Sequence, residues 1–317
     1  MKSVLIVCEA GTGLGLGHFY RSLALAQMLS SDFQVMLLSN NSSLPETTFN
    51  RFIVDSFEDF PDYKSFEIVV LDGYQFNSRL ISKFISESIR FIEISDFQEQ
   101  LYPTPFWINT SMESDLPGKG LQYGLLRKEI LEVAKKRTFE EKKLDSIFVA
   151  FGGTDELSNS LKTVEALHDA HYFSRIGVLY PDNGKDAELL KEYAASGLDI
   201  EVKIFSNLSA HQLIETTNQY AVALVSSSTI ACEMIALRKM VFTCCLYENQ
   251  QLLHDQLIKS KAAFSANLNE IQEITASLVF QLMHPKINPE AIFNFQKKLI
   301  DGFAEERIRN FISNCVE

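Results

Sequence analysis

The stretch VLIVCEAGTGLGLGHFYRSLALA, residues 4–26, decides the fold class of this chain. It begins as an apolar run, continues as a glycine-rich loop and ends in a segment where Leu and Ala recur with helical spacing. This order of strand, glycine-rich loop and helix is typical of the first crossover of a parallel α/β sheet. Because the strand starts almost at the first residue, with no small-residue cleavage site before the loop, we expect no signal peptide and a cytoplasmic location.

The same alternation of short apolar runs and longer helical segments continues through the 317 residues. The predicted strands are residues 4–8, 34–39, 68–72, 91–95 and 106–109 in the first half, and 147–151, 176–180, 200–205, 222–226 and 241–246 in the second. The charged stretch 128–145 separates the two series and indicates a solvated helix or linker. We therefore predict an α/β protein with two Rossmann-like domains, residues 1–140 and 141–288, and C-terminal helices at 289–317 that cross back to the first domain.

Composition limits the partners of the chain. Apolar residues make up 46% and charged residues 22%, and no run of about 18 apolar residues occurs, so we expect a globular protein without a membrane span. The net charge of −12 argues against nucleic acid or an anionic membrane as the main partner. Five cysteines without a C-x-x-C spacing predict buried free thiols.

The glycine-rich loop at residues 11–17 matches neither common nucleotide-binding pattern. In the dinucleotide pattern G-x-G-x-x-G the third glycine position falls on Leu16 or on His18, and no P-loop Gly-Lys-Ser/Thr sequence occurs. The glycines still allow a ligand to approach the backbone, and the helix behind them directs free N–H groups toward it. His18 stands where the loop meets the helix, so it is either an imidazole facing a substrate or a structural, helix-capping histidine.

Two more polar loops open helices after predicted strands, which is where ligands bind in open α/β sheets. Residues 152–154 either wrap a diphosphate or form a turn and a helix cap. Residues 226–229 carry four hydroxyl groups, which either bind phosphate or cap the helix that follows. Glu233 lies one turn farther, where its carboxylate either accepts both ribose hydroxyls or is an acid favoured by the helix dipole.

Further acids and amides follow other predicted strands, namely Asp72, Asp96 and the pair Asn249-Gln250. A metal site is not expected. His168 and His171 are spaced i,i+3 on a surface helix without a carboxylate or cysteine partner in that helix.

Several of these motifs together resemble a known family. They are Gly15-Leu16-Gly17-His18-Phe19-Tyr20-Arg21, Leu71-Asp72-Gly73-Tyr74, residues 123–127, 151–155 and 226–233, Asn249-Gln250, and Asp301-Gly302 followed by Arg307. Each motif is common alone, but the ordered set resembles the UDP-2,4-diacetamido-2,4,6-trideoxy-β-L-altropyranose hydrolases of pseudaminic acid biosynthesis. These hydrolases are related to the MurG glycosyltransferase.

The resemblance implies a GT-B fold with the sugar handled by the first domain and UDP held mainly by the second. It implies hydrolysis of a UDP-linked deoxy-diacetamido sugar to free sugar and UDP, with a UDP-sugar as the partner and no metal or other cofactor. His18 would be the general base, and Glu233 would bind the ribose. The implied site residues are His18, Asp72 and Tyr74 for catalysis, Gly152, Gly153, Thr154, Ser227, Ser228, Thr229 and Glu233 for the nucleotide, and Gly15, Gly17, Arg21, Asn249 and Gln250 on the sugar and diphosphate side.

The chain departs from the hydrolase pattern at the sugar end. Val7 and Glu9 stand where an Arg-x-Asp pair is usual, Gly73 replaces the histidine of an Asp-His-Tyr motif, and Asp96 follows Ser95 where two acids are usual. A GT-B glycosyltransferase that uses a UDP-sugar donor and an acceptor other than water is therefore the alternative. A nucleotide-sugar binding module without catalysis is the third hypothesis, and the sequence does not determine the oligomeric state.

Overall fold

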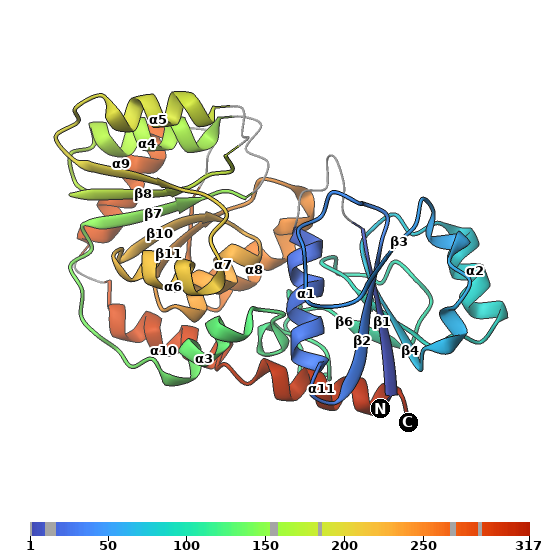
Figure 1. Cartoon of the computed structure of the whole chain (residues 1–317). Helices are drawn as coiled ribbons and strands as arrows, with labels where there is room; N and C mark the ends of the chain where they lie inside the picture. Colours follow the sequence, from blue (N-terminus) through green and yellow to red (C-terminus); the bar gives the residue numbers. More distant parts are fainter. Residues whose placement is uncertain (1, 10–16, 153–157, 183–185, 267–270, 285–286) are drawn as a thin grey trace. The chain divides into compact units, whose positions relative to one another are not determined.

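The computed structural model describes residues 2–9, 17–152, 158–182, 186–266, 271–284 and 287–317, with only the backbone described at 271–276. Contacts divide the chain into two compact units. The first unit consists of Met1–Lys128 and Phe303–Glu317, and the second of Glu129–Gly302. Each unit is built around its own parallel sheet (Figure 1).

The sheet of the first unit has the strand order β3-β2-β1-β4-β5-β6, which is the order of the Rossmann fold. Its strands are β1 (Lys2–Cys8), β2 (Phe33–Ser39), β3 (Arg51–Ile53), β4 (Ile68–Asp72), β5 (Phe91–Ile94) and β6 (Phe106–Ile108). Its helices are α1 (Gly17–Leu29), α2 (Ser78–Ser86) and α11 (Ala304–Cys315), with 3₁₀ turns η1 (Phe57–Asp59), η2 (Tyr63–Ser65) and η3 (Leu121–Tyr123). Helices α1 and α11 pack together on one side of this sheet and α2 lies on the other (Figure 1).

The second unit repeats this architecture with the strand order β12-β11-β10-β7-β8-β9. Its strands are β7 (Ser146–Ala150), β8 (Arg175–Leu179), β9 (Glu201–Phe205), β10 (Val222–Ser226), β11 (Met240–Cys244) and β12 (Phe264–Ser265). Its helices are α3 (Lys128–Lys136), α4 (Asn159–Asp169), α5 (Ala187–Ala195), α6 (Ala210–Asn218), α7 (Thr229–Ala236), α8 (Gln251–Lys259), α9 (Ile271–Met283) and α10 (Pro289–Leu299), with the 3₁₀ turn η4 (Glu248–Gln250). Helices α4, α5 and α9 lie on one side of the sheet, and α6, α7 and α8 on the other (Figure 1).

Continuous aliphatic runs explain the central strands, because a parallel strand covered by helices is buried on both faces. Residues 4–7 of β1 and 222–225 of β10 are fully buried. Local signals set several helix starts. Ser209 and Gln212 form a capping box on α6, and the Asn288 side chain caps α10, which has Pro289 at its first position.

The predicted strands are confirmed, with ends that differ by at most two residues. Two strands were missed, β3 and β12, and each lies at an edge of its sheet. Each pairs with a neighbour on one side only and has just three or two residues. Such short edge strands lack the apolar run or alternation that reveals a strand in a sequence. The five cysteines are free thiols, as expected, and all are buried except Cys245, which is partly exposed.

The division between the units differs from the sequence-based one. It falls at residues 128–129 instead of 140–141, because α3 packs into the second unit, where the Ala134 carbonyl accepts a hydrogen bond from Arg238. Helix α10 also belongs to the second unit, whereas α11 contacts α1 and η3 of the first. Gly302 stands between them with φ +90°, and a Cβ atom there would lie 2.6 Å from the Leu131 carbonyl oxygen.

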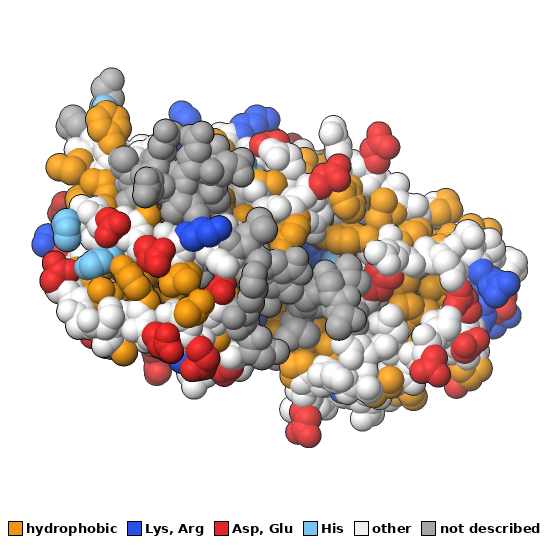
Figure 2. Space-filling model, turned by 90° about the horizontal axis from the view of Figure 1, so that it is seen from above, with side chains coloured by type: hydrophobic (Ala, Val, Ile, Leu, Met, Phe, Trp, Pro, Cys, Tyr) orange, Lys and Arg blue, Asp and Glu red, His pale blue; other side chains and the backbone are white. Residues whose placement is uncertain are grey.

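On the face shown in Figure 2, Lys and Arg side chains lie in small scattered groups among Asp and Glu side chains. Among the described residues, no helix is long and apolar enough to cross a membrane.

Candidate functional site

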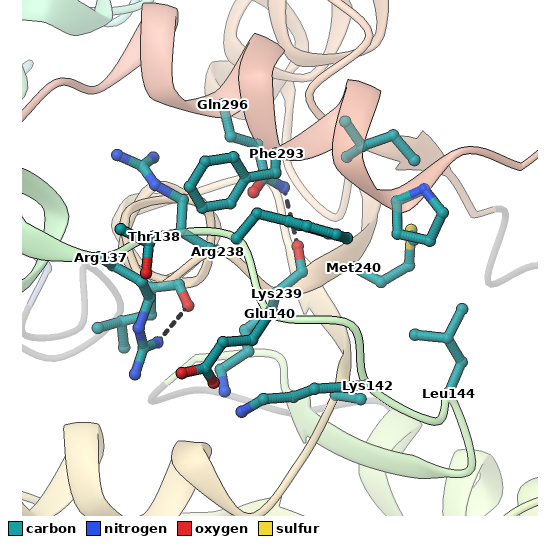
Figure 3. A pocket seen from close by; sticks show the side chains of 15 residues that line it. Arg137, Thr138, Glu140, Lys142, Leu144, Arg238, Lys239, Met240, Phe293 and Gln296 are labelled. Atoms are coloured by element: carbon teal, nitrogen blue, oxygen red, sulfur yellow. Dashed lines mark hydrogen bonds between the residues drawn. The ribbon is translucent and has the colours of Figure 1, made fainter.

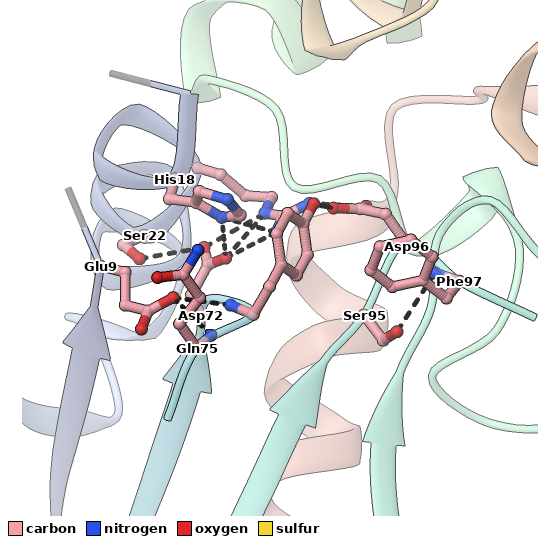
Figure 4. A network of polar contacts seen from close by, with 10 residues as sticks. Glu9, His18, Ser22, Asp72, Gln75, Ser95, Asp96 and Phe97 are labelled. Atoms are coloured by element: carbon pink, nitrogen blue, oxygen red, sulfur yellow. Dashed lines mark hydrogen bonds and ion pairs between the residues drawn. The ribbon is translucent and has the colours of Figure 1, made fainter. Parts of the chain in front are cut away.

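A polar network surrounds Asp72 at the carboxyl end of β4 (Figure 4). The Nδ1 atom of His18 lies 2.7 Å from Asp72 Oδ1, and the Ser22 hydroxyl donates to Oδ2 over 3.0 Å. Both residues belong to the first turns of α1, which follows β1, the strand beside β4. The Arg21 guanidinium donates to both Asp72 oxygens, at distances from 2.5 to 3.2 Å. The parallel sheet thus brings residues about 50 positions apart to one strand end.

Asp72 is ionised although it is fully buried. Burial alone would raise the pKa of this carboxyl, but the charge of Arg21 and the hydrogen bond from His18 outweigh it and hold the pKa well below its ordinary range. For Arg21, burial would lower the pKa, but Asp72 and Asp96 raise it well above its usual value. The two groups therefore form a stable buried ion pair.

This ion pair determines which nitrogen of His18 carries the proton. An ionised carboxylate 2.7 Å from Nδ1 accepts hydrogen bonds only, so Nδ1 is the protonated nitrogen. Arg21 Nη2 lies 3.1 Å from the same atom, at a longer distance. In the described part of the chain nothing hydrogen-bonds to Nε2. The Nε2 lone pair is therefore available to accept a proton from a ligand.

Asp96 extends the network from the carboxyl end of β5. Both of its oxygens lie 2.7 Å from Arg21 Nη1, and the Tyr74 hydroxyl donates to Oδ2. The Tyr74 ring contacts the His18 ring edge-on, with 4.7 Å between ring centres. Arg21 is thus directed onto two carboxylates, which differs from its expected place on the sugar and diphosphate side of a ligand.

Two departures from the hydrolase pattern, Glu9 and Gly73, turn out to be coupled. Glu9 Oε2 accepts the N–H groups of Tyr74 and Gln75 over 2.6 and 2.9 Å, which holds the turn after β4. A Cβ atom on residue 73 would lie only 2.4 Å from that oxygen. Glycine is required at 73 because the Glu9 carboxylate occupies the space of a side chain.

In the second unit, the loop after β10 leads into α7. The Ser227 and Ser228 N–H groups donate to the carbonyls of Cys244 and Ser226, over 2.8 Å each. Both amides are therefore engaged within the protein, and their role as diphosphate donors stays a prediction. Within the described residues, the N–H groups of Thr229 and Ile230, at the start of α7, contact no acceptor, as is usual for the first N–H groups of a helix.

The Ser227 hydroxyl is also engaged, because it lies 2.9 Å from His254 Nδ1 and 3.0 Å from the Cys244 carbonyl oxygen. His254 Nε2 in turn lies 3.0 Å from the Ser265 hydroxyl on β12. His254 of α8 therefore ties the loop before α7 to the edge of the sheet. Burial lowers its pKa, so the neutral imidazole is favoured.

The remaining predicted site residues of the second unit follow the carboxyl ends of its strands. Glu233 is buried in the second turn of α7. Gln250 Oε1 accepts the N–H of Leu246 over 2.9 Å, so Gln250 holds its own loop, and the half-buried Asn249 is next to it in η4. Gly152 has φ +103°, and no atom of the described residues lies within 4 Å of the place where its Cβ would be. Gly15, Gly153 and Thr154 lie outside the described residues, and Gly17 is the first residue of α1.

A pocket of about 60 Å³ lies at the opposite, amino end of the second sheet, beside the starts of β10 and β11 (Figure 3). Three of its four basic residues, Arg137, Arg238 and Lys239, cap helices. Arg137 donates to the carbonyl at the end of α7 over 2.6 Å, and Lys239 to one at the end of α6 over 2.5 Å. Arg238 donates to carbonyls at the ends of α3 and α10, over 3.1 and 2.8 Å. These contacts give the three residues a structural role, because they satisfy carbonyl groups at the ends of helices.

The described residues contain no group of three or more His, Cys, Asp or Glu side chains that could hold a metal ion. His168 does have a carboxylate partner, which the sequence did not reveal because it comes from another element: its Nε2 lies 2.8 Å from Asp199. Sequence reasoning also missed Ser22 and His254 as parts of the two loops. Ser22 is one helical turn after His18, a spacing that could have revealed it, whereas His254 carries no sequence signal.

Comparison with known proteins finds the fold and no close relative. No family model matches this sequence, and no curated protein matches it. Among solved structures, MurG of Acinetobacter baumannii is similar with a TM-score of 0.66 and 12% identity, covering 99% of this chain and 100% of MurG. Os79 of O. sativa, in complex with U2F and trichothecene, has a TM-score of 0.69 and 9% identity, covering 99% and 100%.

The Streptomyces sp. SF2575 glycosyltransferase SsfS6, complexed with thymidine diphosphate, has a TM-score of 0.61 and 11% identity, covering 99% of this chain and 100% of its own. The two six-stranded parallel sheets and these neighbours confirm the predicted GT-B fold. At such identities the likeness concerns the fold alone.

Proposed function

We propose that this chain transfers the sugar of a nucleoside diphosphate sugar to a hydroxyl acceptor, with His18 as the general base. The observation that carries the proposal is the His18–Asp72 pair. A buried, ionised carboxylate holds Nδ1–H of the imidazole at 2.7 Å and leaves Nε2 to accept a proton. An oriented imidazole of this kind is what general base catalysis needs.

In the proposed step, Nε2 of His18 takes the proton of the acceptor hydroxyl as its oxygen attacks the anomeric carbon. The bond between that carbon and the diphosphate oxygen breaks, and the diphosphate leaves with the electron pair. His18 becomes an imidazolium, which the Asp72 carboxylate stabilises. The Tyr74 ring against His18 restricts the imidazole to one orientation.

The leaving diphosphate needs donors, and the first unit offers it none from Arg21, which is directed onto Asp72 and Asp96. We therefore assign the diphosphate to the N–H groups at the start of α7 and to the backbone at Gly152, where a Cβ would meet no atom of the described residues. Glu233, one turn into α7, would bind the ribose. The solved neighbour SsfS6, complexed with thymidine diphosphate, supports a nucleotide site in such a fold.

Hydrolysis is the second candidate, with water as the acceptor. The ordered motifs around His18, Asp72 and Glu233 favour it because they resemble the UDP-sugar hydrolases. The GT-B neighbours that are glycosyltransferases favour transfer to another hydroxyl. Both reactions use the same base and the same diphosphate site, so the acceptor alone separates them.

The test is incubation with a panel of UDP- and TDP-sugars, with and without a mixture of hydroxyl acceptors, while release of the nucleoside diphosphate is measured. Release that depends on an acceptor identifies a transferase, and equal release without one identifies a hydrolase. His18→Asn should lower kcat by about 10²-fold or more and change nucleotide affinity by no more than about threefold. Unchanged kcat in the folded His18→Asn protein would remove the basis of the proposal.

A further inference from the structure

The pocket at the amino end of the second sheet takes no part in the proposed reaction (Figure 3). It has a volume of about 60 Å³, and its lining residues all belong to the second unit and to the described part of the chain. A buried water molecule needs a cavity of roughly 10–15 Å³. The pocket therefore has room for about four to six groups of that size, which matches a phosphate or sulfate ion.

Four cationic side chains line this pocket, Arg137, Lys142, Arg238 and Lys239, and Glu140 is the one carboxylate among its described lining residues. In the described part of the chain, none of the four cations forms an ion pair. Three of them contact carbonyl groups instead, at the ends of α3, α6, α7 and α10. Carbonyl groups carry no net charge, so the helix dipoles and Glu140 are what balances the four cations.

The helix ends do not balance these charges fully. The end of a helix carries about half a negative charge, so the four ends and Glu140 offset roughly three of the four positive charges. Burial and the charges of Arg137 and Lys142 lower the pKa of Lys239 to about 6. Burial and Arg137 likewise lower the pKa of Arg238 to about 10. Cations that lower one another's pKa lie in a positive potential, which an anion in the pocket would neutralise.

We propose that the pocket is a binding site for a free tetrahedral oxyanion of the phosphate and sulfate class, held by Lys142, Arg137 and Lys239. Lys142 is exposed and has no hydrogen-bond partner among the described residues. Arg137 has donors to spare, since two of its five N–H groups contact Leu237 and Asn218. Lys239, which is 4% exposed, donates to two carbonyls and keeps a third N–H when it is protonated. The apolar side chains that line the rest of the pocket exclude water and so strengthen these charge-assisted bonds.

The pocket is separate from the site of the proposed reaction, and the inference does not depend on that reaction. Arg137 contacts the end of α7, whereas the donors assigned to the diphosphate are at the start of this helix. An α-helix rises about 1.5 Å per residue, so the 8 residues of α7 place its two ends about 12 Å apart. Charges at a protein surface are largely screened beyond about 8 Å at physiological salt. A charge changed at the pocket is therefore not expected to alter binding at the start of α7.

Alternate residues of the segment before β7 give matched variants. Residues 140, 142 and 144 line the pocket, whereas residues 141 and 143 do not. Lys142→Gln removes a positive charge from the pocket, and Lys143→Gln removes the same charge one position away. Glu140→Gln removes the carboxylate from the pocket, and Glu141→Gln is its control. All four side chains are exposed, so these changes leave the packed interior intact.

The experiment is calorimetric titration of the full chain with sodium sulfate, and then with inorganic phosphate, at an ionic strength held constant with sodium chloride. Saturating UDP is present, so that the start of α7 is not open to the titrant. We expect a Kd below about 10 mM for the wild type. Lys142→Gln should weaken binding by about fivefold and Glu140→Gln should tighten it by about threefold, because each variant changes the charge beside the anion. Lys143→Gln and Glu141→Gln should each change the Kd by less than about twofold.

The two pocket variants test the site in opposite directions. A gain in affinity in Glu140→Gln cannot arise from loss of folding, so it supports the site even if Lys142→Gln proves less stable than expected. A Kd above about 10 mM for both anions in the wild type would overturn the inference. Equal effects of the pocket variants and their controls would also overturn it, because binding would then depend on the overall charge of the chain alone.

Discussion

Replacing Gly73 with Ala places a methyl group where the Glu9 carboxylate lies. The new Cβ would be 2.4 Å from Oε2, 2.6 Å from Cγ and 2.7 Å from Cδ of Glu9, so the carboxylate must move. The backbone conformation of residue 73 is compatible with alanine, because its φ lies outside the left-handed region. Overpacking of this kind costs about 1–3 kcal/mol, and displacement of Oε2 also weakens its two backbone hydrogen bonds. We expect a loss of about 2–3 kcal/mol in the free energy of unfolding of the first unit.

Glu9→Ala alone should cost about 2–3 kcal/mol, because the N–H groups of Tyr74 and Gln75 lose their acceptor. Independent effects would add to about 4–6 kcal/mol in the double variant. Removal of the Glu9 side chain opens the space that the methyl group introduced by Gly73→Ala needs, so we expect the double variant to lose no more than Glu9→Ala does. The coupling energy is then about 2–3 kcal/mol.

Urea unfolding followed by tryptophan fluorescence measures these losses. The single tryptophan, Trp107, lies on β6 of the first unit, with Lys119 Nζ 3.1 Å from its ring centre, so its emission reports on that unit. Gly17→Ala is the control, since a Cβ at Gly17 meets no atom of the described residues within 4 Å. Additive losses, within about 0.5 kcal/mol, would refute the idea that Glu9 and Gly73 share one space.

Four further outcomes are expected. Asp72→Asn should lower kcat by about 10²-fold or more while nucleotide affinity measured by calorimetry stays within about threefold, because the neutral amide no longer fixes the His18 tautomer. Glu233→Ala should weaken UDP binding by about 10-fold or more in calorimetry, and unchanged affinity would exclude the ribose role. Burial lowers the pKa of His254 in the folded protein, so below a pH of about 6.5 the unfolded chain binds a proton that the folded chain does not. The free energy of unfolding therefore decreases as the pH is lowered through this range. His254→Gln should flatten this part of the curve of unfolding free energy against pH. Activity should survive treatment with EDTA, and an absolute requirement for added Mg²⁺ would contradict the assignment of the diphosphate to backbone donors alone.

The central strands of both sheets could be predicted because burial on two faces requires continuous apolar runs, as in residues 4–7 and 222–225. The parallel order then brings strand ends together, so Asp72 and Asp96 could be nominated from sequence position alone. The edge strands β3 and β12 could not be predicted, because two or three residues paired on one side carry no pattern of their own.

The side-chain contacts within the site could not be predicted from the sequence. Arg21 was expected near a diphosphate, but two carboxylates located 51 and 75 positions later in the chain engage it. The Ser227 hydroxyl was expected near phosphate, but His254, 27 positions away, lies beside it. Spacing along one element cannot reveal such pairs, since they depend on which loops the sheet order brings together.

The charges of the first unit agree with the chemistry proposed for it. When His18 takes a proton, it becomes cationic, and the anomeric carbon also gains positive charge as its bond to the diphosphate weakens. Asp72 and Asp96, with Glu9 beside them, stabilise positive charge that develops at both places. The same carboxylates would repel a diphosphate, and Arg21 cannot offset this because it already contacts two of them. The proposed function therefore assigns the departing negative charge to donors of a different kind, the N–H groups at the start of α7, which carry the positive end of a helix dipole. A base surrounded by acids and a diphosphate site built from backbone donors are thus two requirements of one reaction, and a basic residue placed beside His18 would weaken the first without improving the second.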